Sequence, residues 1–157
     1  MKKIICMILI AACLLACAAS CEAMDKRLSD VFDRCKASVV SMSMGNFAEA
    51  VTVLNTAAVS PERLGDIVKA KCPRLIGSVP QTEYAVAWRE KSDRYLAVPV
   101  EVPSYKAAPC AIFKMNDNYE VLSVDFTDWA DVTIRYAQSP EIRWNVEYIP
   151  DFFAVID

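Results

Sequence analysis

Apolar residues recur at steps of three and four along the first part of the chain. Between about residues 25 and 43, the positions with this spacing are Leu28, Val31, Phe32, Cys35, Val39 and Met42. Such spacing places side chains on one face of an amphipathic helix. Gly45 follows, and glycine fits the left-handed position that commonly ends a helix. We therefore expect a first helix over about residues 25–43.

Two further helices are predicted from their start signals. Asn46 followed by Glu49 resembles a capping box in which Asn replaces the usual Ser or Thr. Ser60 precedes Pro61, and proline is favoured at the first helical position. Pro73 then ends the third helix. The apolar stripes of these two helices are Phe47, Ala50, Val51 and Leu54, then Leu64, Ile67 and Val68.

From about residue 83 the period of the apolar pattern changes to two, which is typical of strands. Alternation predicts six strands, near residues 84–88, 95–102, 110–115, 122–126, 132–136 and 142–148. Turns are expected at Lys91-Ser92-Asp93 and Asn116-Asp117-Asn118, and Pro99 favours an edge strand or a bulge. In the fourth segment we expect Leu122, Val124 and Phe126 to face inward. The pattern indicates an antiparallel meander with one solvent-exposed face.

Helices followed by strands favour an α+β fold. We expect about three N-terminal helices packed on a curved antiparallel sheet of four to six strands. The helices would cover the apolar face of the sheet, because their stripes have no other partner. No internal repeat or linker interrupts residues 24–157, so we expect them to form one domain.

Residues 1–23 have the pattern of an export signal. Lys2 and Lys3 precede an uncharged apolar run over residues 4–16, which is shorter than the ~20 residues of a membrane span. Leu14-Leu15-Ala16-Cys17 resembles a bacterial lipobox, so Cys17 is the expected lipidation site, with Cys21 as the alternative. Cleavage after Ala23 would instead release a soluble protein. Either way, we expect location in the bacterial cell envelope, on the periplasmic face of a membrane, or secretion.

Three of the seven cysteines lie in the expected domain: Cys35, Cys72 and Cys110. In an oxidising compartment we expect a Cys35–Cys72 disulfide, because both residues lie on predicted N-terminal helices. The alternative is that all three are small buried apolar residues.

Composition excludes several kinds of chemistry. The chain has no histidine, which removes Ser-His-Asp and Cys-His catalysis and zinc binding through HExxH. Its three glycines leave no phosphate loop and no dinucleotide fingerprint, and we expect no cofactor. A formal charge of −3 argues against nucleic acid as a partner.

Charge is unevenly distributed along the chain. Residues 24–75 hold eight basic and six acidic residues, whereas residues 115–157 hold two basic and nine acidic ones. Asp125, Asp128 and Asp131 are therefore candidates for binding a basic partner. The alternative is a solvated sheet face. Their three-residue spacing lacks the alternation and glycine of an EF-hand loop, so we expect no calcium or other metal site.

Residues 111–125 (AIFKMNDNYEVLSVD) resemble the late hairpin of NTF2-like, cystatin-like-cone domains. The helix after Gly45-Asn46-Phe47 resembles the second helix of that family. The resemblance implies a conical pocket, which serves as an enzyme site in some members and as a binding surface in others. An enzyme of this kind would draw its proton-transfer groups from Tyr84, Tyr136, Tyr148 and Asp125.

These observations favour an exported envelope protein, a lipoprotein held to the membrane by its N-terminal lipid, that binds a basic protein or a small ligand without catalysis. One alternative is an inhibitor or immunity-type protein that docks a basic partner through its acidic C-terminal face. Another is a pocket enzyme of the NTF2-like kind, an isomerase or a hydrolase.

Overall fold

The computed structural model describes residues 26–103 and 108–138. The predicted signal segment, with the lipidation candidates Cys17 and Cys21, lies outside these residues. So does the predicted strand at 142–148. Within the described part, no helix is both long and apolar enough to cross a membrane.

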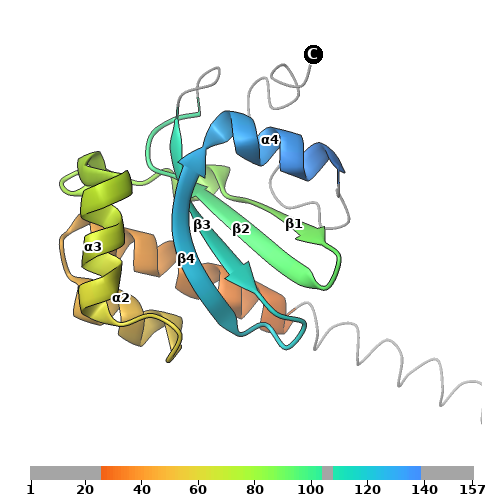
Figure 1. The fold of residues 1–157 in the computed structure, drawn as a ribbon, viewed down its shortest axis with the longest axis horizontal. Helices are drawn as coiled ribbons and strands as arrows, with labels where there is room; N and C mark the ends of the chain where they lie inside the picture. The colour runs from red at the N-terminus through yellow and green to blue at the C-terminus, as the bar shows by residue number, and fades with distance from the viewer. Residues whose placement is uncertain (1–25, 104–107, 139–157) are drawn as a thin grey trace, which may run out of the picture.

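Helices precede a four-stranded sheet, as the α+β prediction requires (Figure 1). A first helix covers residues 26–43. It is followed by α2 (Phe47–Leu54), α3 (Pro61–Lys71) and the short 3-10 turns η1 (Pro73–Leu75) and η2 (Thr82–Tyr84). The remaining elements are β1 (Val86–Glu90), β2 (Asp93–Pro99), β3 (Pro109–Met115), β4 (Val121–Asp128) and α4 (Trp129–Gln138).

The predicted capping residues fix the helix boundaries. The Asn46 side-chain oxygen accepts a hydrogen bond from the Glu49 N–H at 3.3 Å, and the Asn46 amide donates to the Glu49 carboxylate at 2.6 Å. The Ser60 hydroxyl accepts from the Arg63 N–H at 3.2 Å. Gly45 adopts a φ of 75° and ends the first helix. Each cap satisfies backbone groups that a helix end leaves without partners.

The sheet is a meander in the order β1-β2-β3-β4, with every neighbouring pair antiparallel. The prediction that Pro99 marks an edge strand was wrong, because β2 pairs with both β1 and β3, and the register shift lies at Lys114/Met115. The pairing with β1 ends at Ala97, however, so Pro99 itself pairs only with Cys110 of β3. Pro99 is tolerated there because it is the last residue of the strand.

A register shift between Lys114 and Met115 changes which residues of β4 face inward. Val121 is 5% exposed, whereas Leu122, which we expected to face inward, is 40% exposed. Val124 remains buried as predicted. Because of this irregularity, Val121 faces inward in place of the expected Leu122.

The first helix, α2 and α3 form the main hydrophobic cluster with one face of the sheet. All six residues of the predicted first-helix stripe belong to it or pack against it. From the sheet it takes residues such as Leu96, Val98 and Phe113. Gly65 allows α2 and α3 to approach closely, since a Cβ there would lie 3.2 Å from the Phe47 ring.

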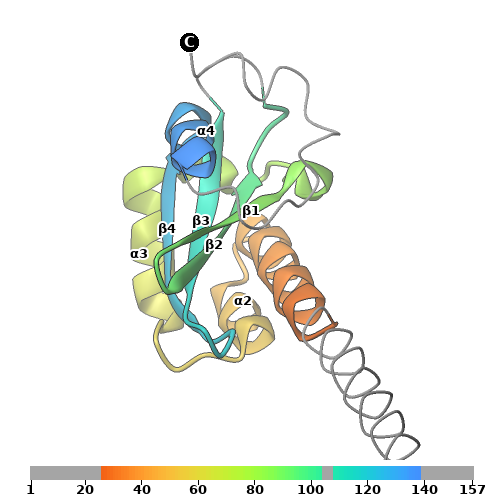
Figure 2. The same ribbon diagram turned by 90° about the vertical axis from the view of Figure 1, so that its right-hand side faces the viewer.

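One end of the opposite face of the sheet is covered by α4, so the expectation of a solvent-exposed face was wrong for that end. The rest of this face is solvent-exposed, as Ser123 and the half-exposed Asp125 side chain show. Figure 2 shows α4 and the first helix on opposite sides of the sheet. Trp129, Val132 and Tyr136, at helical spacing, pack against Val86 and Trp88 of β1 in a second cluster. The predicted strand at 132–136 is therefore a helix.

Candidate functional site

The three cysteines of the described part are free and buried, so the predicted Cys35–Cys72 disulfide is not present. Desolvation raises the pKa of the Cys35, Cys72 and Cys110 thiols above the ordinary value. A thiol must lose its proton to act as a nucleophile. These side chains therefore behave as small apolar core residues, the alternative that the sequence left open.

Asp125 is held within the fold. Its carboxylate accepts hydrogen bonds from Lys71 Nζ at 2.6 and 2.8 Å, and Lys71 is the last residue of α3. The Phe126 N–H donates to the same carboxylate at 2.7 Å. Asp125 thus joins α3 to the edge of the sheet and offers a partner little uncompensated charge.

Asp128 and Asp131 lie where β4 passes into α4. Asp131 accepts a hydrogen bond from the Thr127 hydroxyl at 3.0 Å, and Arg135 Nη1 lies 3.8 Å from its carboxylate. An acidic residue in the first helical turn also stabilises the helix by its favourable interaction with the helix dipole. Asp128 is exposed and, with Lys71, lines a shallow hollow of about 290 Å³. The described residues contain no group of three or more side chains placed to hold a metal ion.

The residues suggested for a pocket enzyme occupy different surroundings. Tyr136 is buried in the second cluster and Tyr84 packs against that cluster. Asp125 is half-exposed and paired with Lys71. Tyr148 lies outside the described residues.

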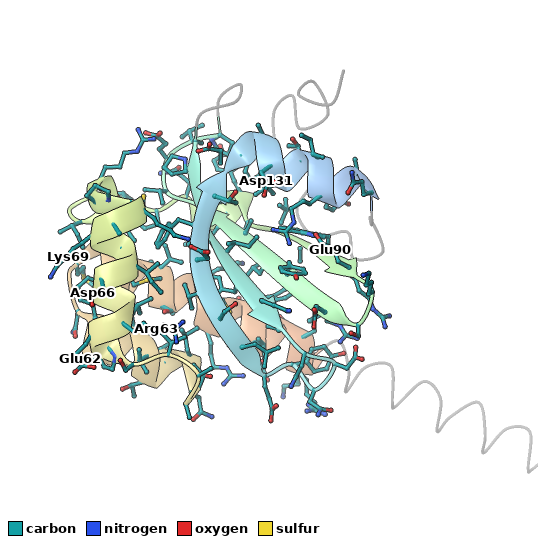
Figure 3. The ribbon with its side chains drawn as sticks, in the orientation of Figure 1. Glu62, Arg63, Asp66, Lys69, Glu90 and Asp131 are labelled. Atoms are coloured by element: carbon teal, nitrogen blue, oxygen red, sulfur yellow. The ribbon has the colours of Figure 1, made fainter. Side chains whose placement is uncertain are left out.

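Sequence reasoning missed a charged and aromatic group, the Arg135 cluster, made of Trp88, Glu90, Tyr95 and Arg135. Trp88 and Tyr95 are directly opposed on β1 and β2, and their rings stack with centroids 5.4 Å apart. The Arg135 guanidinium lies 5.2 Å from the Trp88 ring and 4.5 Å from the Tyr95 ring. Figure 3 labels Glu90, which lies beneath α4.

Glu90 completes this cluster. Arg135 donates to its two carboxylate oxygens, from Nε at 2.7 Å and from Nη2 at 3.1 Å. The Trp88 indole N–H donates to the same carboxylate at 2.7 Å. The hydrogen bonds from Arg135 are the main cause that holds the Glu90 pKa below its ordinary value. Arg135 of α4 and Trp88 of β1 both donate hydrogen bonds to Glu90, so the cluster connects α4 to the sheet.

A polar groove of about 330 Å³, the helix–hairpin groove, lies between the first helix, the end of α2 and the β3–β4 turn. Its polar lining consists of Arg27, Asp30 and Arg34 from the first helix, Asn55 after α2, and Asn118 and Glu120 from the turn. The three residues of the first helix are spaced by three and four, which places them on one face.

Long contacts hold the sides of this groove together. Arg27 Nη2 lies 3.4 Å from the Asn118 carbonyl oxygen, and Arg34 Nη1 lies 3.5 Å from that of Leu54. Tyr119 has a φ of 64°, unusual for a residue with a side chain. The guanidinium groups of Arg27 and Arg94 lie 5.5 and 4.8 Å from its ring centre.

The charged groups on the first-helix side of the groove differ from four arginines elsewhere in the described residues. Arg74, Arg89, Arg94 and Arg135 each pair with a carboxylate. Within the described residues, Arg27, Asp30 and Arg34 form no ion pair. A guanidinium has five N–H donors, and one long contact to a carbonyl leaves most of them available. These side chains can therefore bind a molecule from solution without breaking an ion pair of the fold.

A weak signal for this groove exists in the sequence. Arg27, Asp30 and Arg34 share a helix face, but Asn118 is 91 residues from Arg27. Comparisons with protein-family models, with curated proteins and with solved structures found no match for the chain. The assignment therefore depends on the geometry of this chain alone.

Proposed function

We propose that this chain is an exported protein of the bacterial cell envelope that acts as a non-catalytic binding domain. The helix–hairpin groove is its binding site. A lipid on Cys17, or alternatively on Cys21, anchors the domain to the membrane. The export and anchoring parts of the proposal rest on the pattern of residues 1–23.

The observation that carries the binding role is the state of the groove's charged groups. Arg27, Asp30 and Arg34 line a concave surface without an ion pair among the described residues. By contrast, Arg74, Arg89, Arg94 and Arg135 each pair with a carboxylate, as Arg135 does with Glu90. Charged side chains that form no ion pair within the described part of the chain, gathered in one groove, favour recognition of a polar molecule.

Other described groups fit binding better than catalysis or docking by the acidic face. The three thiols are buried, and desolvation raises the pKa of each. Asp125 and Asp131 are engaged by Lys71 and Thr127. The acidic-face partner and the NTF2-like enzyme remain predictions from sequence, and the groove is the better-supported site.

A thermal-unfolding assay tests the groove. A ligand that binds only the folded protein raises the unfolding midpoint by mass action. We expect fractionated extracts of the bacterial envelope to raise the midpoint of the wild type and of Arg63→Gln, but not that of Arg34→Gln. Arg63 is a matched control, an arginine of α3 outside the groove with no ion pair among the described residues (Figure 3). A shift that survives in Arg34→Gln would exclude the groove as the site.

Intact mass of the mature protein, extracted from membranes, tests the anchor. We expect a chain that begins at Cys17 and carries acyl groups, and Cys17→Ser should abolish acylation. Acylation at Cys21 would support the alternative site. A soluble mature protein beginning at Met24 would refute the lipid anchor and leave the binding role of the groove to the first assay.

A further inference from the structure

The surface that the helix–hairpin groove offers to a ligand is polar. Its aliphatic lining residues are themselves covered: Val31, Leu54 and Val121 are 4%, 2% and 5% exposed. The Tyr119 ring is also nearly buried. Most small-molecule sites are lined mainly by apolar side chains. A molecule that enters this groove therefore meets charged and amide groups, and an apolar ligand would gain little by burial.

The charges of the lining balance. Arg27 and Arg34 are opposed by Asp30 and Glu120, and Asp30 lies between the two arginines on the helix. A strongly anionic ligand would approach this carboxylate, and a cationic one would approach the guanidinium groups. Either arrangement brings like charges together, which is unfavourable. The lining therefore favours a ligand without net charge.

The lining of the groove offers both donors and acceptors. Arg27 and Arg34 only donate and Asp30 only accepts, whereas the Asn55 and Asn118 amides do both. A hydroxyl group donates one hydrogen bond and accepts two, so neighbouring hydroxyls can satisfy both kinds of group. Extended peptides commonly use an open strand edge or apolar side-chain pockets. The lining of this groove comes from a helix, a helix end and a turn.

We infer that the helix–hairpin groove binds a short neutral saccharide, an inference that rests on the proposed binding function and names its ligand class. The groove volume of about 330 Å³ lies at the small end of the range for ligand sites. A groove of this volume fits a saccharide of one to a few sugar units. Asp30 and Arg34 would hold ring hydroxyls, and the turn residues Asn118 and Glu120 would contact them from the opposite side.

Nuclear magnetic resonance titration of the mature protein tests this inference. The probes are maltotriose, triacetylchitotriose, trigalacturonate and penta-alanine. We expect at least one of the two neutral saccharides to shift backbone amides of residues 27–34 and 118–121. Trigalacturonate and penta-alanine should cause no saturable shift there. Asp30→Asn and Arg34→Gln should each weaken saccharide binding about tenfold, as expected for loss of a charge-assisted hydrogen bond.

Arg63→Gln, whose side chain is outside the groove, should bind as the wild type does. Unperturbed amide spectra of the variants would show that they remain folded. Shifts with penta-alanine or trigalacturonate alone would overturn the saccharide inference while preserving a binding groove. No saturable shift with either neutral saccharide also overturns it, and the extract assay above then decides separately whether the groove binds another ligand. Saccharide shifts confined to other regions would refute the placement of the site.

Discussion

The two faces of the sheet are covered in different ways. On one face, the first helix, α2 and α3 surround a large, mainly aliphatic cluster. On the other, the single helix α4 packs over a smaller cluster that contains Trp88, Trp129 and Tyr136. An arginine–glutamate pair and two stacked rings reinforce this second contact.

This difference separates two means of stabilisation. The first face depends on the amount of apolar surface that several elements remove from water together. The second depends more on a few directional contacts between α4 and the strands β1 and β2. We therefore expect damage to the first face to unfold the whole domain, whereas damage to the second should first release α4.

Phe113→Ala should have the largest effect. Phe113 is fully buried on β3, one of the two inner strands, and its removal leaves a cavity in the first-face cluster. We expect a loss of about 3–5 kcal/mol in the free energy of unfolding, measured by chemical denaturation. Its neighbour Ile112 faces the second cluster, so Ile112→Ala is the matched comparison and should cost less, about 2 kcal/mol. Equal losses would contradict the proposed asymmetry.

Arg135→Met should release α4 while the first-face cluster remains intact. The substitution keeps an apolar side chain but leaves Glu90 without its guanidinium partner, so we expect a loss of about 1–3 kcal/mol. Thiol labelling gives a local readout. Cys110 belongs to the second cluster and Cys35 to the first, so labelling of Cys110 should increase more than labelling of Cys35. Equal increases would indicate global unfolding and argue against a separable α4.

Glu90 should make the second-face contact sensitive to acid. Its pKa in the folded protein is lowered from the ordinary value of 4.5, so the resulting stabilisation is present above that pH. It is lost as the pH falls through the lowered pKa. Denaturation curves between pH 7 and pH 3 should therefore show the wild type and Arg135→Met converging in stability below about pH 4.5. A difference that stays constant across this range would exclude a contribution from Glu90.

Asp125→Asn should have the smallest effect. The Lys71–Asp125 pair joins α3 to the sheet edge, but both side chains are about half exposed. Water and salt screen such a pair, so we expect a loss below about 1 kcal/mol that disappears in concentrated salt. Chemical denaturation at low and high salt measures this, with Asp128→Asn as a control for total charge. A larger, salt-independent loss would show that Asp125 has a structural role beyond the ion pair.

Local signals in the sequence predicted the N-terminal helices well. The Asn46 and Ser60 caps satisfy their own helix starts, so a few adjacent residues contain the necessary information. Residues 132–136 were wrongly predicted to be a strand, because a short segment can fit both the two-residue period of a strand and the 3.6-residue period of a helix. Val132, Ile134 and Tyr136 alternate as in a strand, yet Trp129, Val132 and Tyr136 share a helix face. Packing against β1 selects the helix, and Ile134 is left 46% exposed.

The contacts that define the site and the second face connect distant parts of the chain. Arg135 and Glu90 are 45 residues apart, and Arg27 and Asn118 are 91 apart. Neither distance produces a periodic pattern that a single sequence reveals. The acidic residues were visible in the sequence, but their intramolecular partners, such as Lys71 for Asp125, depended on the tertiary fold.

The meander topology has a consequence for the order in which the chain folds. Each strand pairs with its neighbour in sequence, and Lys91 and Ser92 alone connect β1 to β2. Closing short loops costs little entropy, so such hairpins can form early and quickly. We expect α4 to dock last. It contacts β1, the strand furthest from it in sequence, and this contact closes the longest loop. A chain translocated from its N-terminus could thus complete the first-face core before its C-terminal helix arrives.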